Sequence, residues 1–414
     1  MDIGKTVTEI FGNLPDEDVL KVQPVAQTAL RTNLHVHLPP NFGSIKSVAD
    51  AITKAGAEDI AVLGASNYYD HTIYTAFAHA AVKARIAPVF GIEILTMHEQ
   101  LRDAGILIND PQNPGKGYLC GKGLTCFDCI RADTFVIWNK IREGDKQRII
   151  EMNVKVNQIE LLQRQDIQLQ YDAIAQAIAA EKQVPVATVF LQERHVAQAL
   201  QQAIFEKIPA TARENFLQQL YQVKGPVELQ NIVAVQEAIR SYLLKQGRIA
   251  FVDEQFVNPA EAAELIIGLG GYVSRPILID GAPQILPGEG TPQELTANTL
   301  EHQIAAVEFI PNRNDLKVLT EYVRVLRANG IAVGAGTEHN VATWIPLLPN
   351  CRKVPLSTEL TEIFWEGACV AVAHQYLRAK GHESFRFLPE RAAREEQIQA
   401  MTTLGAQVIA FLRR

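Results

Sequence analysis

Two histidines stand two residues apart in the segment Asn33-Leu34-His35-Val36-His37. Alternate side chains of a strand point to the same face, so a strand here would aim both imidazole rings at one point. Paired imidazoles are ligands that borderline divalent ions such as Zn²⁺ prefer. The segment therefore predicts a metal site, although a bare HxH pattern is equally compatible with polar side chains that decorate a strand end.

Carboxylates accompany three later apolar segments. Glu93 and Glu338 each stand two residues after a glycine at the end of an apolar run, and Glu308 lies within another such run. Side chains at these positions could join His35 and His37 around a metal ion. We favour this role for Glu93 and Glu338, whereas Glu308 is at least as well explained as a polar residue whose hydrogen bonds are satisfied.

A stretch rich in glycine and lysine, residues 109–123, follows the segment that holds Glu93, and Lys122 lies in it between Gly121 and Gly123. Backbone N–H groups and an ammonium in such a stretch can cradle an anion. The spacing of a nucleotide-binding P-loop is missing. An ordinary turn-rich connection is therefore expected, with a role as a lid or substrate loop left open.

Three cysteines, Cys120, Cys126 and Cys129, form the pattern C-x5-C-x2-C. A closed zinc site needs four thiolate or imidazole ligands, usually supplied as two pairs. Only one pair with that spacing is present in this sequence. Three thiols without a metal are therefore expected here.

These residues fall within the first and last parts of the chain, the two flanks, where short apolar runs alternate with helical patterns. Strands are expected over about 32–36, 59–64, 87–95, 271–279, 305–310 and 331–336. Helices are expected over about 44–55, 75–84, 262–269, 294–303, 314–328 and 358–380. This alternation indicates a parallel α/β sheet or barrel, in which the carboxyl ends of the strands gather at one mouth.

The stretch between the flanks has a different composition. A single glycine occurs from Asp145 to Gln246, and 17 of the 95 residues from Lys146 to Arg240 are glutamine. Glutamine, alanine, leucine and glutamate favour helices, and apolar residues recur here at helical spacing. We therefore divide the chain into a first barrel segment (1–145), a helical module (146–247), and a second barrel segment with C-terminal helices (248–414).

Overall composition excludes several classes of protein. The 414 residues include 39 Lys and Arg against 46 Asp and Glu, a net charge of −7 without basic runs, which argues against a nucleic-acid surface. No apolar run approaches the roughly 18 residues of a membrane helix, and the first residues lack a signal-peptide pattern. Five cysteines are too few for a disulfide framework. We expect a cytoplasmic protein without membrane or nucleic-acid partners.

The HVH segment, a following helix that ends in Ala55-Gly56, and the later Gly91-Ile92-Glu93-Ile94 resemble the polymerase and histidinol phosphatase (PHP) superfamily. Its members are metal-dependent phosphoesterases on a distorted, mostly seven-stranded (β/α) barrel. The resemblance implies an α/β protein with a distorted PHP-type (β/α)7 barrel, interrupted by the large helical insertion. It covers about 30–110 and, more weakly, 262–342, and the order of the short motifs supplies most of its specificity.

The metal motifs of that family, HxH, TDH, GxE, AHP and SDxH, are only partly kept. The resemblance assigns one metal ion to His35, His37, Glu93 and Glu338. It places TDH on Ser66-Asn67-Tyr68, AHP on Ser274-Arg275-Pro276, and the last histidine on Asn340. Because the other metals depend on the replaced histidines, it implies a mononuclear site for Zn²⁺, Mn²⁺ or Fe²⁺.

Further roles follow from these aligned positions. Arg275 would supply positive charge where a second metal would have been and would orient an anionic substrate, unless it merely pairs with a barrel carboxylate. His339, beside the position of the lost histidine, is a second candidate catalytic residue or replacement ligand. Candidate substrate contacts are Asn67, Tyr68, Lys122 and Asn340.

The predicted function is a metal-dependent phosphoric ester hydrolase of PHP type that acts on a small anionic or phosphorylated substrate. Two alternatives stay open. One is an amidohydrolase-like metal enzyme, whose superfamily also begins with HxH but adds a bridging lysine and later histidines that cannot be placed here. The other is a non-catalytic ligand-binding protein on a degenerate barrel. The helical module is a candidate surface for oligomerisation.

Overall fold

Seven strands form one sheet in chain order in the computed structural model, which describes residues 3–21 and 28–414. Neighbouring strands are parallel within each half of the sheet, whereas the central strand β4 runs antiparallel to both of its neighbours. The strands are β1 (Arg31–Val36), β2 (Ile60–Ala65), β3 (Ala87–Met97), β4 (Lys116–Lys122), β5 (Tyr272–Ile277), β6 (Ala306–Phe309) and β7 (Ala332–Ala335).

The sheet curls until its first and last strands meet. A bridge joins Val36 to Glu338, and the backbone N–H of Glu338 donates to the carbonyl of His35 at 2.8 Å. Gly336 allows this approach, because a Cβ at that position would collide with the side chain of His35. The sheet is therefore a nearly closed barrel surrounded by helices, and the predicted α/β barrel class is confirmed.

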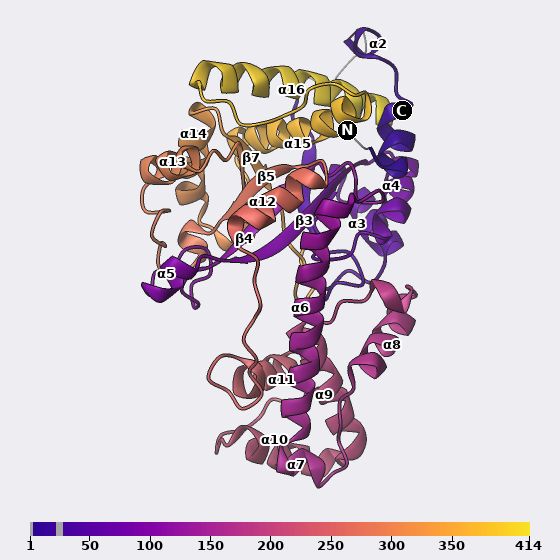
Figure 1. Cartoon of the computed structure of the whole chain (residues 1–414), viewed down its shortest axis with the longest axis vertical. Coiled ribbons are helices and arrows are strands. Elements are labelled where there is room, and N and C mark those ends of the chain that lie inside the picture. The colour runs from indigo at the N-terminus through magenta and orange to yellow at the C-terminus, as the bar shows by residue number, and fades with distance from the viewer. Residues whose placement is uncertain (1–2, 22–27) are drawn as a thin grey trace.

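Helices cover the outside of this barrel. The helices nearest in sequence to the strands are α3 (Val48–Ala57), α4 (Ile73–Lys83), α12 (Pro259–Gly268), α13 (Pro292–Glu301) and α14 (Leu316–Ala328). Two long C-terminal helices, α15 (Thr358–Ala379) and α16 (Arg391–Leu412), lie side by side along one end of the molecule (Figure 1). Because α15 lies between the strands and α16, its residues 367–377 are all buried.

The expected elements of both flanks are present with ends shifted by a few residues, but β4, α16 and several short elements were not predicted. The glycine- and lysine-rich stretch predicted as a loop contains β4, which pairs with β3 along its whole length and with β5 over its last three residues. Its Gly121 is required by packing, since a Cβ there would lie 2.8 Å from Ile92 and 2.9 Å from Ile266. Helix α16 lies in the region expected to hold C-terminal helices, although no bounds were predicted for it, and the expectation of a fully parallel sheet is corrected.

The helical module forms a hydrophobic core of its own. Its helices include α7 (Glu160–Gln163), α8 (Tyr171–Lys182), α9 (Glu193–Lys207), α10 (Arg213–Tyr221) and α11 (Ile232–Ile239), and their buried side chains cluster over residues 149–252. The long helix α6 (Ala132–Asn157) runs from the barrel into the module (Figure 1). Trp138 and Ile141 at its start belong to the barrel core, whereas Met152 and Val156 belong to the module core. The exact domain boundaries stay predictions.

Two further expectations concern cysteines and membranes. Cys126 and Cys129 are joined by a disulfide, which corrects the expectation of three free thiols, while Cys120 is free and buried. Across residues 3–21 and 28–414, no helix combines the length and apolar character needed to cross a membrane.

Candidate metal centre

Three predicted ligands converge inside the barrel: His35 on β1, His37 just after it, and Glu93 on β3. The Nε2 atoms of His37 and His35 lie 3.1 Å and 3.6 Å from the same atom, Glu93 Oε2. All three side chains are buried, and none of these three atoms has a hydrogen-bond partner within the described part of the chain. Buried polar atoms normally have a hydrogen-bond partner. Two imidazole nitrogens and a carboxylate oxygen that converge without one fit the ligand set of a divalent ion.

The opposite nitrogen of each ring is held by a neighbouring side chain. His35 Nδ1 lies 3.1 Å from Glu308 Oε1, and His37 Nδ1 lies 3.2 Å from Asn41 Oδ1. Because Asn41 Oδ1 also accepts from the backbone N–H of Tyr68, it acts here as an acceptor. Because a partner holds Nδ1 of each ring, Nε2 of each ring faces Glu93 and is the nitrogen available to a metal ion, which is how histidine ligands of metals are usually oriented.

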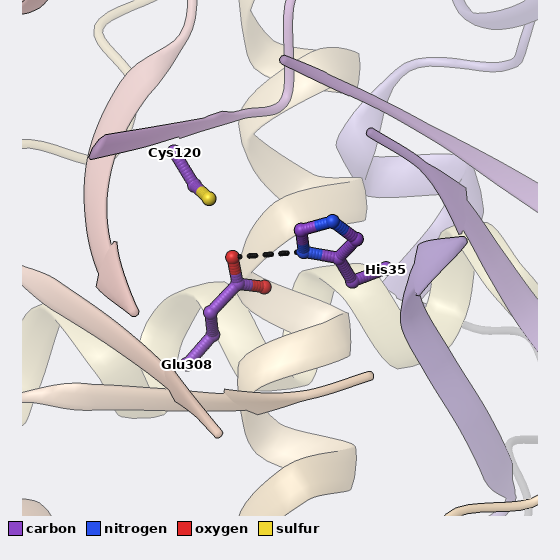
Figure 2. Close-up of side chains that lie close together, drawn as sticks. All are labelled: His35, Cys120 and Glu308. Atoms are coloured by element: carbon purple, nitrogen blue, oxygen red, sulfur yellow. Dashed lines mark hydrogen bonds and ion pairs between the residues drawn. The ribbon is translucent and has the colours of Figure 1, made fainter. Parts of the chain in front are cut away.

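A buried ion pair supports this arrangement from behind. Lys122 Nζ lies 2.7 Å from Glu308 Oε2 and also donates to Ser66 Oγ at 2.8 Å and to the Leu34 carbonyl at 2.9 Å. Figure 2 shows the carboxylate of Glu308 between His35 and the thiol of Cys120. The structure thus places Lys122 in the barrel interior, where three protein acceptors use its ammonium, rather than in a position to contact substrate as predicted.

The charged groups in this interior strongly shift one another's pKa values. Burial disfavours the carboxylate of Glu308, but the ammonium of Lys122 and the imidazole of His35 outweigh burial and lower the pKa of Glu308 to about 2. Burial likewise disfavours a charged His35, but Glu308 outweighs it and raises the pKa of His35 to about 9. Two carboxylates, Glu93 and Glu308, thus face the ammonium of Lys122 and the imidazolium of His35, and a divalent ion bound at Nε2 would replace the proton of that imidazolium.

A cavity of about 170 Å³ lies beside Glu93. Its wall includes Arg313, from the short helix η6 (Pro311–Arg313), paired with the carboxylate of Glu338. Asn340 donates to the same carboxylate at 2.7 Å and also lines the cavity. Glu338 therefore faces the cavity next to the three converging ligands, although it does not belong to their group, and its predicted role as a fourth ligand stays a prediction.

The two predicted catalytic residues, Arg275 and His339, form hydrogen bonds away from the converging ligands. In the strand register Arg275 pairs with Val307, so its side chain lies on the face of the sheet opposite to that of Glu308, and it donates to Asn298 on α13. His339 engages both ring nitrogens, with Thr337 Oγ1 at 2.8 Å and with the Ile345 carbonyl at 2.8 Å. The structure therefore brings neither residue to the converging ligands, and their predicted roles are not retained.

The two residues aligned with the TDH motif support the site instead of extending it. Asn67 holds the backbone of Leu38 through two hydrogen bonds, at 2.7 Å and 3.0 Å. The ring of Tyr68 stacks on that of His37 with 4.8 Å between centroids and also lines the cavity. Of the two, Tyr68 is therefore in a position to meet a ligand.

Several residues that shape the site were missed or undervalued in the sequence. Glu308 in the apolar strand β6 gave a usable signal, because a carboxylate is rarely buried without a partner. Arg313 and Asn41 gave none, since their closeness to the histidines comes from the barrel topology, and Cys120 was noticed only as part of a cysteine pattern. Lys122 was noticed for a different reason, its glycine neighbours.

Comparison with known proteins identifies solved structures with a similar fold but does not assign the chain to a family. No protein-family model matches the chain, and no curated protein is significantly similar to it. Among solved structures it is similar to a candidate metal-dependent phosphoesterase from Bifidobacterium adolescentis, with 13% identity, 82% of this chain and 96% of that chain covered, and a TM-score of 0.52. An amidohydrolase from Chromobacterium violaceum, solved with sulfate and without metal, gives 16% identity, coverage of 80% and 96%, and a TM-score of 0.45. The first match shows a shared fold.

Proposed function

We propose that this chain is a metal-dependent hydrolase in which His35, His37 and Glu93 hold one divalent ion. The observation that carries the proposal is the convergence of three buried ligand atoms that lack hydrogen bonds within the described residues. A divalent ion bound there would polarise a substrate oxygen and lower the pKa of a water molecule. Glu308 and Asn41 would keep the two imidazoles in the orientation that binding requires.

The proposed substrate is a small phosphate ester. Arg313 is the cation of the cavity beside Glu93, and its side chain is 40% exposed, so a ligand can reach its guanidinium. A guanidinium binds phosphate through paired hydrogen bonds. Because the carboxylates of Glu93, Asp110 and Glu338 also line the cavity, the charge of a bound divalent ion would be needed beside Arg313 to attract an anion. The phosphoesterase named among the solved structures of similar fold favours the same substrate class.

Other cavity residues suit supporting tasks. Glu338, held by Arg313 and Asn340, is a carboxylate that can accept a proton at the cavity wall. The phenol rings of Tyr68 and Tyr118 line the same cavity and reduce the space open to water. This division gives Arg313 the substrate-orienting role that the sequence had suggested for Arg275.

The test combines metal analysis with a substrate panel. Metal-depleted protein is reloaded with Mn²⁺, Zn²⁺ or Fe²⁺, and the bound metal is counted before phosphomonoesters, phosphodiesters and amides are assayed. We expect one ion per chain and turnover of a phosphate ester. His35→Ala and Glu93→Ala should lose both metal and turnover, whereas His79→Ala, which removes an exposed histidine of α4, should keep both.

Three results would refute the proposal. Full metal occupancy in both His35→Ala and Glu93→Ala would show that the ion binds elsewhere. Turnover of amides without turnover of any phosphate ester would overturn the substrate class and favour an amidohydrolase-like enzyme. Bound metal at this centre without any turnover would favour the non-catalytic alternative.

A further inference from the structure

Lys122 is enclosed by the barrel directly behind the three converging ligands. Its side chain is 2% exposed, although lysine is among the residues least often buried without a partner. An ammonium has three protons, and three acceptors surround this one: Glu308 Oε2, Ser66 Oγ and the Leu34 carbonyl. Each proton of the Lys122 ammonium thus has an acceptor inside the protein, and Lys122 cannot bind a substrate anion.

The groups around this ammonium resemble a second metal site. A ring nitrogen of His35, the thiol of Cys120 and a carboxylate oxygen of Glu308 all lie within 4.8 Å of one another, and all three residues are buried (Figure 2). Thiolate, imidazole and carboxylate are the usual ligands of zinc-like ions. One oxygen of that carboxylate already faces the His35 ring, and the other faces Lys122.

We propose that Lys122 is a tethered cation that occupies this second position, so that the chain takes up one exchangeable metal ion at His35, His37 and Glu93 and none at Glu308. The inference rests on the proposed function only in taking those three residues as the metal centre. It deepens that function, because it explains how a site with two neighbouring groups of ligands remains mononuclear.

The same ammonium makes Lys122 a positioning residue for His35. Its Nζ lies 2.7 Å from Oε2 of Glu308, and Oε1 of the same carboxylate lies 3.1 Å from Nδ1 of His35, so Lys122 fixes the carboxylate that orients the imidazole ring. Nε2 of His35 then faces Glu93. Without Lys122, Glu308 would be free to bind a metal ion together with the thiolate of Cys120.

Titration of the full chain with Co²⁺ tests this inference, because a thiolate bound to Co²⁺ gives a charge-transfer absorption that oxygen and nitrogen ligands do not. The wild-type protein should bind one ion and show no thiolate absorption. Lys122→Ala removes the ammonium and opens space beside Glu308, so this variant should bind two ions and gain the absorption. Lys122→Ala with Cys120→Ser should lose the absorption again.

Matched variants separate charge from space. Lys122→Met removes the charge but fills much of the same volume, so it should stay at one ion without thiolate absorption. Two ions or thiolate absorption in the wild-type protein would overturn the inference, as would a folded Lys122→Ala variant that binds only one ion. If Lys122→Ala does not fold, Cys120→Ser decides: unchanged Co²⁺ affinity supports the inference, and a tenfold or greater loss overturns it.

The two proposals fail in different ways. A wild-type protein that binds no Co²⁺ would refute the proposed function and the one-ion part of this inference, but not the exclusion of metal from Glu308 by Lys122. In that case a thiolate-bound ion gained by Lys122→Ala would still support the role of Lys122, and its absence would refute that role as well.

Discussion

The imidazole of His35 is held by Glu308, 3.1 Å from its Nδ1, while its Nε2 lies 3.6 Å from Glu93. Glu308 in turn depends on Lys122, so three side chains from β1, β4 and β6 act as one unit. At the scale of residues, we therefore predict that substitutions of Glu308 or Lys122 alter metal binding almost as much as substitutions of the ligands themselves.

Glu308→Gln should weaken metal binding by about 10–100-fold, the usual effect of losing a partner of a ligating histidine. It should also cost on the order of 3–5 kcal/mol of unfolding free energy, since it leaves Lys122 buried without its carboxylate. Competition titration and chemical denaturation measure the two effects. Adding Lys122→Met should restore part of the stability but not the metal affinity, and recovery of both would contradict the role given to Glu308.

Arg313 and Arg275 offer a matched pair of arginine substitutions. Arg313→Ala should lower kcat/KM for a phosphate ester by about 10–100-fold, as expected when a charge-assisted hydrogen bond worth about 1.5–3 kcal/mol is lost. Arg275→Ala should leave kcat/KM nearly unchanged, because its side chain bonds to Asn298 on the opposite face of the sheet. Steady-state kinetics of both variants decide this, and the reverse ranking would restore the role first suggested for Arg275.

At the scale of elements, the contact between β1 and the end of β7 positions His35. Gly336→Ala should lower the unfolding free energy by about 1–3 kcal/mol and weaken metal binding, because the new methyl group would push β1 away from β7. Gly56→Ala on α3 is the control, since a Cβ there meets no atom within 4 Å. Denaturation and metal titration of both variants test this. Unchanged metal binding in Gly336→Ala would show that barrel closure does not position the ligand.

How far the sequence predicts these elements depends on the range of the interactions. β1 and β3 could be predicted because apolar runs ending in HxH and GxE are local signals. β4 could not, because its glycines and lysines suggest a loop until the packing of Ile266 against Gly121 is known. Arg275 was misplaced for a related reason, since a strand register shifted by one residue would turn its side chain to the other face.

At the scale of the whole molecule, two hydrophobic cores are joined along α6. The composition of residues 146–247 was enough to predict a helical module, because glycine depletion and glutamine content are local properties. The contacts of this module with the barrel could not be predicted. They include the N–H of Phe42, which follows β1 and donates to Gln192 at the start of α9 at 3.0 Å.

The junction also holds a partly buried acidic group, Asp145 on α6. Burial raises its pKa to about 6, and Arg148 only partly offsets burial. A folded-state pKa above the usual value of about 3.9 means that the ionised carboxylate disfavours folding above pH 6, and that this penalty fades as the pH falls through 6. Asp145→Asn should therefore raise the unfolding midpoint at pH 8 relative to wild type, but much less at pH 4.5. Equal effects at both pH values would contradict the buried-carboxylate assignment.

Metal location tests the central claim most directly. Crystals of the metal-loaded protein, measured at the absorption edge of the bound metal, should show one anomalous peak. We predict that this peak lies about 2.0–2.3 Å from Nε2 of His35, Nε2 of His37 and a carboxylate oxygen of Glu93. A peak between Cys120 and Glu308, or metal-loaded crystals without a peak at the three predicted ligands, would contradict the account.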